Sequence, residues 1–212
     1  MDARGLKAAD VFLQMALDFT SVAPNHPDKA VRESMREGFR KNLEYAAVCQ
    51  SKHVTALPGV WFEDREKSFE TCCNELLWRV EQAKKYNIIF GIEGHIGSIA
   101  QTPEELLDLL NNVPGLTLSL DYTHFLRQDI PQERCHPLIP YASHFHMRGA
   151  ARGRLQTPMS ENEIDYPHIL KVLKEGNYDG FIGVEYTYND WEDCNKTDNL
   201  SETILMKRLI EQ

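Results

Sequence analysis

Four short apolar runs in this chain each end in a residue of a type that binds hard divalent cations. The four residues are Glu93, Asp121, His146 and Glu185, and the gaps between them are 28, 25 and 39 residues. One strand and its returning helix occupy about that length. Side chains at the ends of successive strands meet only when the strands are parallel and curl round an axis, as they do at the C-terminal mouth of a β/α barrel. The spacing therefore predicts such a barrel, with its chemistry at this mouth.

The rest of the chain alternates between strand and helix patterns, and nothing in it reads as a linker. Apolar runs predict strands over residues 11–16, 54–57, 88–92, 116–121, 143–147 and 181–185. Apolar spacing and capping residues predict helices over 28–50, 66–86, 102–113, 132–139, 165–174 and 200–210. Six strands do not close an eight-stranded barrel. We therefore expect an α/β fold, an incomplete TIM-type barrel of about six parallel strands with outer helices, as one domain over residues 1–212.

Composition limits the partners and the compartment. The net charge is −9, and an acidic chain repels phosphate backbones, so we expect no nucleic-acid partner. No run approaches the ~18 apolar residues of a membrane span, and the first ten residues lack the apolar segment of a signal peptide. The five cysteines are odd in number and form no C-x-x-C pair. They fit the reduced thiols of a cytoplasmic protein without a disulfide framework.

Fragments at the four strand ends resemble the xylose isomerase-like TIM barrel superfamily. The fragments are Glu93-Gly94-His95, Asp121-x-x-His124, His146-x-Arg148 and the glutamate of the last strand, Glu185. The likeness runs from about Val11 to the C-terminus, and it is strongest to the branch of ketose 3-epimerases and hydroxypyruvate isomerase. It implies that Glu93, Asp121, His146 and Glu185 are metal ligands at the ends of the family's strands five to eight.

The resemblance also implies roles for two further residues and a missing part. The family's histidine three residues after the aspartate falls on His124, and its substrate-binding arginine falls on Arg152. Matched in this way, the first strand of this chain is the family's third, and the family's first two βα units have no counterpart. We therefore expect a homo-oligomer, or a partner that covers the open edge of the barrel, because an exposed parallel edge promotes association.

Three carboxylates and one imidazole suit Mn²⁺ best among the candidates, with Mg²⁺, Co²⁺ or Zn²⁺ as alternatives. Such a cation would hold the carbonyl and the adjacent hydroxyl of a keto sugar or related polyol, a small carbohydrate substrate. Glu93 and Glu185 would then remove and return the proton next to the carbonyl, through an enediolate. The sequence therefore predicts a metal-dependent sugar isomerase or epimerase.

Three other functions remain open from the sequence. The same first proton abstraction begins the reaction of a dehydratase, or of a lyase acting on a 3-keto glycoside. An abasic-site endonuclease is disfavoured by the acidic charge, and an inactive fragment by the complete ligand set. We expect no redox cofactor, because the Gly91–Gly94 stretch is too short for a dinucleotide-binding fingerprint.

Several residues near the four strand ends have competing interpretations. We expect His95 and His124 to bond substrate oxygens, although either could be a loop histidine satisfied by backbone. His144 is interpreted as a core residue beneath the metal, with the alternative that it replaces His146 as a ligand. Of the three arginines after the strand at 143–147, Arg152 has the family spacing. We expect the other two, Arg148 and Arg154, to pair with surface charges.

Overall fold

The structure is a computed structural model that describes residues 4–16 and 18–212. It divides into two compact units, residues 1–119 and residues 120–212, which we call unit 1 and unit 2. In the part of the chain that is described, no helix is both long enough and apolar enough to cross a membrane. The prediction of a single domain over the whole chain stays a prediction.

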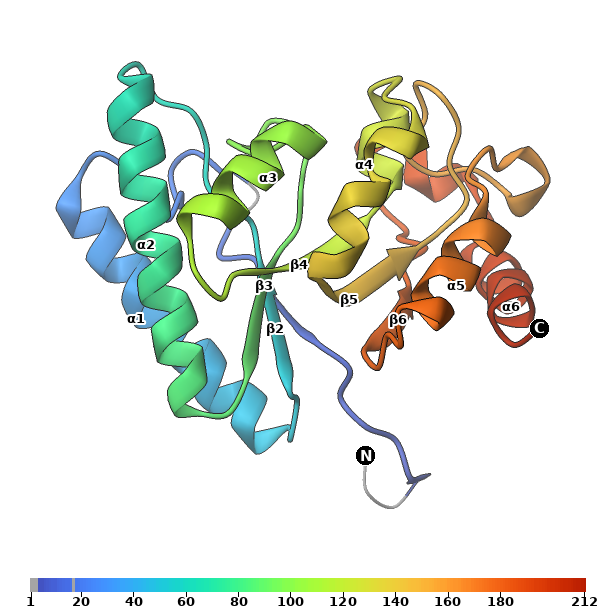
Figure 1. The fold of residues 1–212 in the computed structure, drawn as a ribbon, viewed down its shortest axis with the longest axis horizontal. Helices are drawn as coiled ribbons and strands as arrows, with labels where there is room; N and C mark the ends of the chain where they lie inside the picture. The colour runs from blue at the N-terminus through green and yellow to red at the C-terminus, as the bar shows by residue number, and fades with distance from the viewer. Residues whose placement is uncertain (1–3, 17) are drawn as a thin grey trace. The chain divides into compact units, whose positions relative to one another are not determined.

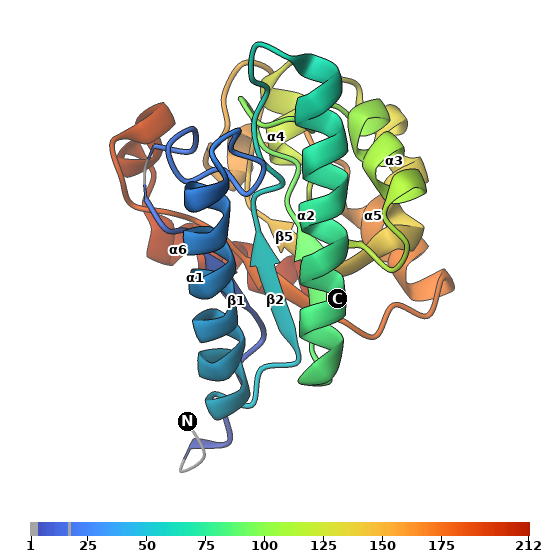
Figure 2. The ribbon, with the colours of Figure 1, turned by 90° about the vertical axis from the view of Figure 1, so that its left-hand side faces the viewer.

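Unit 1 is a parallel sheet covered by helices. Its elements are β1 (Val11–Leu13), α1 (Lys29–Val48), β2 (His53–Ala56), α2 (Arg65–Lys85), β3 (Ile89–Ile92), α3 (Pro103–Asn112) and β4 (Thr117–Asp121), whose last two residues belong to unit 2. The pairs β1–β2, β2–β3 and β3–β4 are all parallel and follow chain order. Helices α1 and α2 run side by side over one face of β2 and β3 (Figures 1 and 2).

The first helix packs a stripe that differs slightly from the one its sequence suggests. Asp28 caps α1 by accepting a hydrogen bond from the amide of Ala30. Met35, Phe39 and Leu43 are buried, as the four-residue spacing predicts. The next member of that spacing, Ala47, is exposed, and Ala46 is buried instead. A spacing of four drifts round a helix of 3.6 residues per turn, so the core-facing position moves back by one.

The second helix buries two charged residues that apolar spacing excludes from a core. Asp64 caps α2, and Leu76 and Val80 are buried as expected. The apolar spacing of this helix also places Cys73 and Leu77 on the core face, but they are only half-buried, whereas Glu75 and Arg79 are buried. The predicted core face was therefore partly wrong. Two charged residues can be buried here because Arg79 donates a hydrogen bond of 3.0 Å to Glu75.

Unit 2 pairs two further strands and carries three helices. Its elements after β4 are α4 (Thr123–Arg127), β5 (Ala142–Met147), α5 (Tyr166–Glu175), β6 (Phe181–Val184) and α6 (Asn199–Ile210), with the 3₁₀ segments η2 (Gln132–Arg134), η3 (His136–Tyr141), η4 (Met159–Glu161) and η5 (Trp191–Lys196). Strands β5 and β6 are parallel, with His146 opposite Gly183. Helix α6 contacts β6 (Figure 1). The predicted helix at 132–139 is instead two 3₁₀ turns, because Pro137, near the start of the second, has no amide hydrogen to continue a helix.

Candidate metal centre

Three of the four predicted ligands lie together in unit 2. Asp121 ends β4, His146 lies near the end of β5, and Glu185 directly follows β6. One nitrogen or oxygen atom from each of these three side chains lies within 4.8 Å of those of the others. His146 Nδ1 is 3.5 Å from Glu185 Oε2. The amide of Glu185 continues the β5–β6 pairing by donating to Met147 O at 3.0 Å, which fixes the glutamate beside His146.

The chemistry of these three residues fits a hard divalent cation. Asp121 and His146 are buried and Glu185 is half-buried, so they offer two carboxylates and an imidazole in a place mostly shielded from water. Glu185 Oε2 is itself buried, and it accepts no hydrogen bond from any residue that the structure describes. A buried carboxylate oxygen without a hydrogen bond is costly unless a cation satisfies it. The site therefore has the donor atoms that a divalent ion needs, and Glu185 Oε2 makes only longer ion-pair contacts, with His146 and Arg148.

An arginine that we expected on the surface lies inside this cluster. Arg148 has only 3% of its surface exposed. Its Nη2 donates to Asp121 Oδ2 at 2.9 Å and lies 3.4 Å from Glu185 Oε2. The expectation of surface charge pairing was wrong because side chains alternate along a strand. Arg148 continues the inward face of His144 and His146, and that period of two was the sequence signal for its position.

Arg148 also governs the ionisation of the aspartate. Burial alone would raise the pKa of Asp121, since a charged carboxylate loses its hydration. The positive charge of Arg148, assisted by His124 and His146 and by a hydrogen bond from Thr123, outweighs burial and holds this pKa below its ordinary value. Asp121 is therefore a carboxylate, the form that a metal ion requires.

His124 lies beside the cluster on the short helix α4. Asp121 Oδ1 accepts a hydrogen bond of 2.8 Å from the amide of Thr123, which helps to fix the first turn of this helix. His124 is buried, and its Nε2 lies 3.7 Å from Asp121 Oδ2 and 3.5 Å from Arg148 Nη2. The ring of Trp191 is tilted against the imidazole, with 6.5 Å between ring centres. His124 thus lies beside the candidate ligand Asp121, as its spacing of three residues predicts.

The turn that carries Trp191 is held by an ion pair. Glu192 and Asp193 have positive backbone φ angles, of 52° and 59°, which residues other than glycine rarely adopt. Glu192 accepts two hydrogen bonds of 3.0 Å from the guanidinium of Arg127 on α4. This pair joins the two segments that follow β4 and β6 and offsets the strain of the turn.

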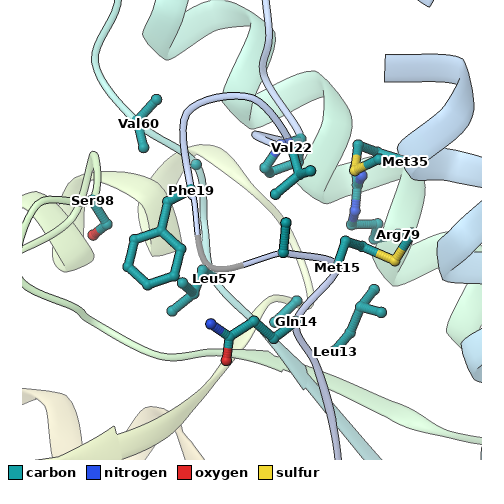
Figure 3. Close-up of a pocket in the computed structure, with 14 residues that line it drawn as sticks. Leu13, Gln14, Met15, Phe19, Val22, Met35, Leu57, Val60, Arg79 and Ser98 are labelled. Carbon is teal, nitrogen blue, oxygen red and sulfur yellow. The ribbon is translucent and has the colours of Figure 1, made fainter. Parts of the chain in front are cut away.

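The fourth predicted ligand, Glu93, belongs to unit 1, where it directly follows β3. It is buried, and its amide donates to Ala56 O at 3.2 Å. His95 is also buried, with Nδ1 2.7 Å from Ile96 O and its ring edge-on to Phe19 at 5.1 Å. Phe19 lines an apolar pocket of unit 1 beyond the ends of β1 and β2 (Figure 3). This pocket escaped the sequence analysis because its lining combines residues of loops, strands and helices that lie far apart in the chain.

The remaining candidates lie farther from the cluster or beneath it. Arg152 is on the surface, with 62% of its side chain exposed, and donates to Asp129 Oδ1 at 2.7 Å. Arg154 is also exposed and pairs with Glu161 at 2.6 Å, as expected for a surface arginine. His144 is buried with its ring edge-on to His146, at 5.0 Å between centres, which is the place expected of a core histidine.

Two uncharacterized proteins of Methanocaldococcus jannaschii are similar to this chain. MJ1188 is 25% identical over 169 residues, which cover 76% of this chain and 62% of the relative. MJ1311 is 26% identical over 182 residues, which cover 79% of this chain and 61% of the relative. The chain therefore spans less than two thirds of the length of these relatives.

Solved structures match nearly the whole chain. A D-tagatose 3-epimerase-like protein matches with a TM-score of 0.73 and 21% identity, covering 100% of this chain and 82% of that one. An L-ribulose 3-epimerase matches with a TM-score of 0.79 and 14% identity, covering 99% of this chain and 77% of that one. A xylose isomerase-like TIM barrel protein from Mycobacterium smegmatis, in complex with magnesium, matches at 0.71 and 13%, covering 99% and 76%.

These likenesses confirm the expected TIM-type α/β fold. The model of one family, the xylose isomerase-like TIM barrel, matches residues 1–208. That match spans both units and all six strands. The chain belongs to the xylose isomerase-like TIM barrel family.

Proposed function

We propose that this chain is a divalent-metal-dependent isomerase or epimerase acting on a keto sugar or a related polyol. The observation that carries the proposal is the cluster of Asp121, His146 and Glu185, with one buried glutamate oxygen that accepts no hydrogen bond within the described residues. Family membership supports it, as does the similarity to a 3-epimerase, to a 3-epimerase-like protein and to a protein in complex with magnesium.

We infer that Glu93 completes the ligand set. Strands β3 and β4 pair in parallel with Ile92 opposite Leu118, so Glu93 comes opposite Ser119. Asp121 is two residues beyond Ser119 on the same continuous strand, and a strand repeats its side-chain direction every two residues. Glu93 follows β3 and Asp121 ends β4, which is the order in which the sequence predicts the ligands. Three carboxylates and one imidazole suit Mn²⁺ best, with Mg²⁺, Co²⁺ or Zn²⁺ as alternatives.

The bound cation would supply positive charge that polarises a substrate carbonyl. Glu93 and Glu185 would each hold the proton that leaves and returns at the carbon next to this carbonyl. His95 and His124, both buried beside a ligand, would bond substrate oxygens and fix their orientation. Arg152 would bind substrate oxygens by exchanging its ion pairs with Asp129 and Glu163.

Proton exchange in D₂O tests the proposal. The purified chain is incubated with MnCl₂ and a panel of ketoses and 3-keto glycosides, and products are followed by NMR. Solvent deuterium incorporated into an intact carbon skeleton is the expected result. Loss of water or of the aglycone would instead assign the dehydratase or lyase reaction.

A pair of variants then tests the role of the glutamate. Glu185→Gln should abolish turnover with an unchanged circular dichroism spectrum. Glu175→Gln makes the same change at an exposed position on α5 and should leave turnover intact. Turnover retained in Glu185→Gln would refute the assignment.

The expected oligomer also stays a proposal. Within unit 2, β6 pairs only with β5 among the described residues, and Phe181 at its start is exposed. An open strand edge with an exposed aromatic side chain favours association. Light scattering coupled to gel filtration measures the mass, and a monomer at all accessible concentrations would contradict the proposal.

A further inference from the structure

The guanidinium of Arg148 occupies the place where a cation is needed in the candidate metal centre. Its Nη2 donates to Asp121 Oδ2 at 2.9 Å and lies 3.4 Å from Glu185 Oε2, so one positive charge bridges two of the proposed metal ligands. Arg148 therefore brings a positive charge to the carboxylates that a metal ion would bind.

Arg148 cannot leave easily, because both its side chain and its backbone are held. Its Nε donates to Thr123 Oγ1 at 3.2 Å, and its Nη1 donates to the backbone oxygen of Glu185 at 3.4 Å. The hydroxyl of Tyr166 donates to Arg148 O and accepts from Arg148 N. A divalent ion would therefore share the site with this positive charge.

The two carboxylates hold Arg148 unequally. The contact with Asp121 is a hydrogen bond, whereas Glu185 Oε2 accepts none, although it lies within ion-pair distance of Arg148. Glu185 is also the more exposed of the two side chains. Glu185 can therefore move toward a divalent ion without breaking a hydrogen bond to Arg148, while Arg148 keeps its hydrogen bond to Asp121.

We propose that Arg148 is an internal counter-cation of the metal centre. It keeps Asp121 and Glu185 together in the metal-free protein, and it lowers the affinity of the site so that the divalent ion remains exchangeable. This inference rests on the proposed function, because it assumes that the cluster binds a divalent ion. Arg148 is a positioning residue here and is assigned no direct part in proton transfer.

The sign of one change in affinity separates this idea from a merely structural role. If Arg148 only holds the ligands in place, replacing it scatters them and weakens metal binding. If Arg148 competes with the metal, replacing it with a neutral side chain of similar length strengthens binding. We expect Arg148→Met to bind Mn²⁺ about tenfold more tightly, because like charges a few ångströms apart in a buried site repel strongly.

The measurement is Mn²⁺ affinity by isothermal titration calorimetry, together with melting temperature in EDTA. Arg148→Lys keeps the positive charge but loses the planar fork of donors, so it should bind Mn²⁺ more weakly than Arg148→Met does. Arg154→Met removes an exposed arginine from the same segment and should change neither quantity. In EDTA, Arg148→Met should melt below the wild type, because Asp121 is then left buried without its cation, and Mn²⁺ should raise its melting temperature more than that of the wild type.

Two failures are distinguishable. A wild-type chain that binds none of Mn²⁺, Mg²⁺, Co²⁺ and Zn²⁺ would overturn the proposed metal site, and this inference with it. A wild type that binds Mn²⁺ beside an Arg148→Met variant that binds it equally or more weakly would overturn the inference alone. If Arg148→Met folds only with metal, both proteins are purified with Mn²⁺ and compared by competition with a chelator.

Discussion

Replacing Glu75 with glutamine should destabilise this chain more than any comparable surface change. Glu75 lies on α2, and only 3% of its surface is exposed. It accepts a hydrogen bond of 3.0 Å from Arg79, which is equally buried, and two more, of 3.1 and 2.9 Å, from Arg36 on α1. Arg32 lies 3.6 Å away. One buried carboxylate therefore lies against three guanidinium groups at the contact between two helices.

The magnitude follows from what the substitution leaves behind. Burial lowers the pKa of Arg79, and the charge of Glu75 opposes that effect. Removing one partner of a buried ion pair costs about 3–5 kcal/mol, because the other charge remains buried without compensation. Glutamine keeps one acceptor oxygen, so we expect about 3 kcal/mol, the lower end. For a chain of this size that corresponds to a fall of about 6–12 °C in melting temperature.

Urea unfolding followed by far-UV circular dichroism measures the loss. The matched control is Glu37→Gln on α1, where the glutamate is 55% exposed and pairs with Arg40 and Lys41 at 3.2 and 3.7 Å. Exposed ion pairs contribute about 1 kcal/mol or less, so the control should remain close to the wild type. Equal losses in the two variants would show that Glu75 does not hold the arginines, and the reasoning would fail.

Three further predictions concern unit 2. Tyr166→Phe removes the hydroxyl that bonds both backbone groups of Arg148, and urea unfolding should show a loss of about 1–3 kcal/mol, with no loss contradicting the role of these bonds. Gly149→Ala should lower the melting temperature, because its Cβ would overlap Thr157 O and Tyr186 Oη; an unchanged value would mean that this loop rearranges freely. Burial, with the charge of His168, lowers the pKa of His136. The unfolded chain therefore binds more protons than the folded chain below pH ~6.5, and the free energy of unfolding decreases as the pH falls. Urea unfolding at about pH 7.5 and about pH 5.5 should show a smaller fall for His136→Gln, and an equal fall would exclude His136 as the cause.

Strand ends and helix caps could be predicted because short-range chemistry decides them. Thr102 and Glu105 form the reciprocal capping bonds that their three-residue spacing predicts, and α3 begins at Pro103. Asp165 likewise caps α5. The order Asp121, His146, Glu185 also needed only the assumption that successive strands are parallel. These features depend on neighbours in the sequence or on one topological rule.

What sequence reasoning missed depends on partners far apart in the chain. Glu75 looks like a surface residue of α2 until Arg36, from another helix, is known to lie against it. The pocket beside Phe19 needs loops whose course no periodicity describes. Arg148 is a different case, since its position followed from strand alternation. The expectation that Arg148 pairs with surface charges followed from its residue type and ignored its place on the strand.

The glycine at position 183 joins the strand register to the geometry of the metal centre. Gly183 lies opposite His146 in the β5–β6 pairing, two residues before Glu185. A Cβ on Gly183 would lie 3.2 Å from both His144 Nε2 and His146 Cδ2, which is tighter than ordinary contact. The two histidine rings therefore fill the space that a side chain on β6 would use. Even a methyl group on this residue would require one of the two rings to shift, so Gly183 helps to place His146 although it offers no ligand atom.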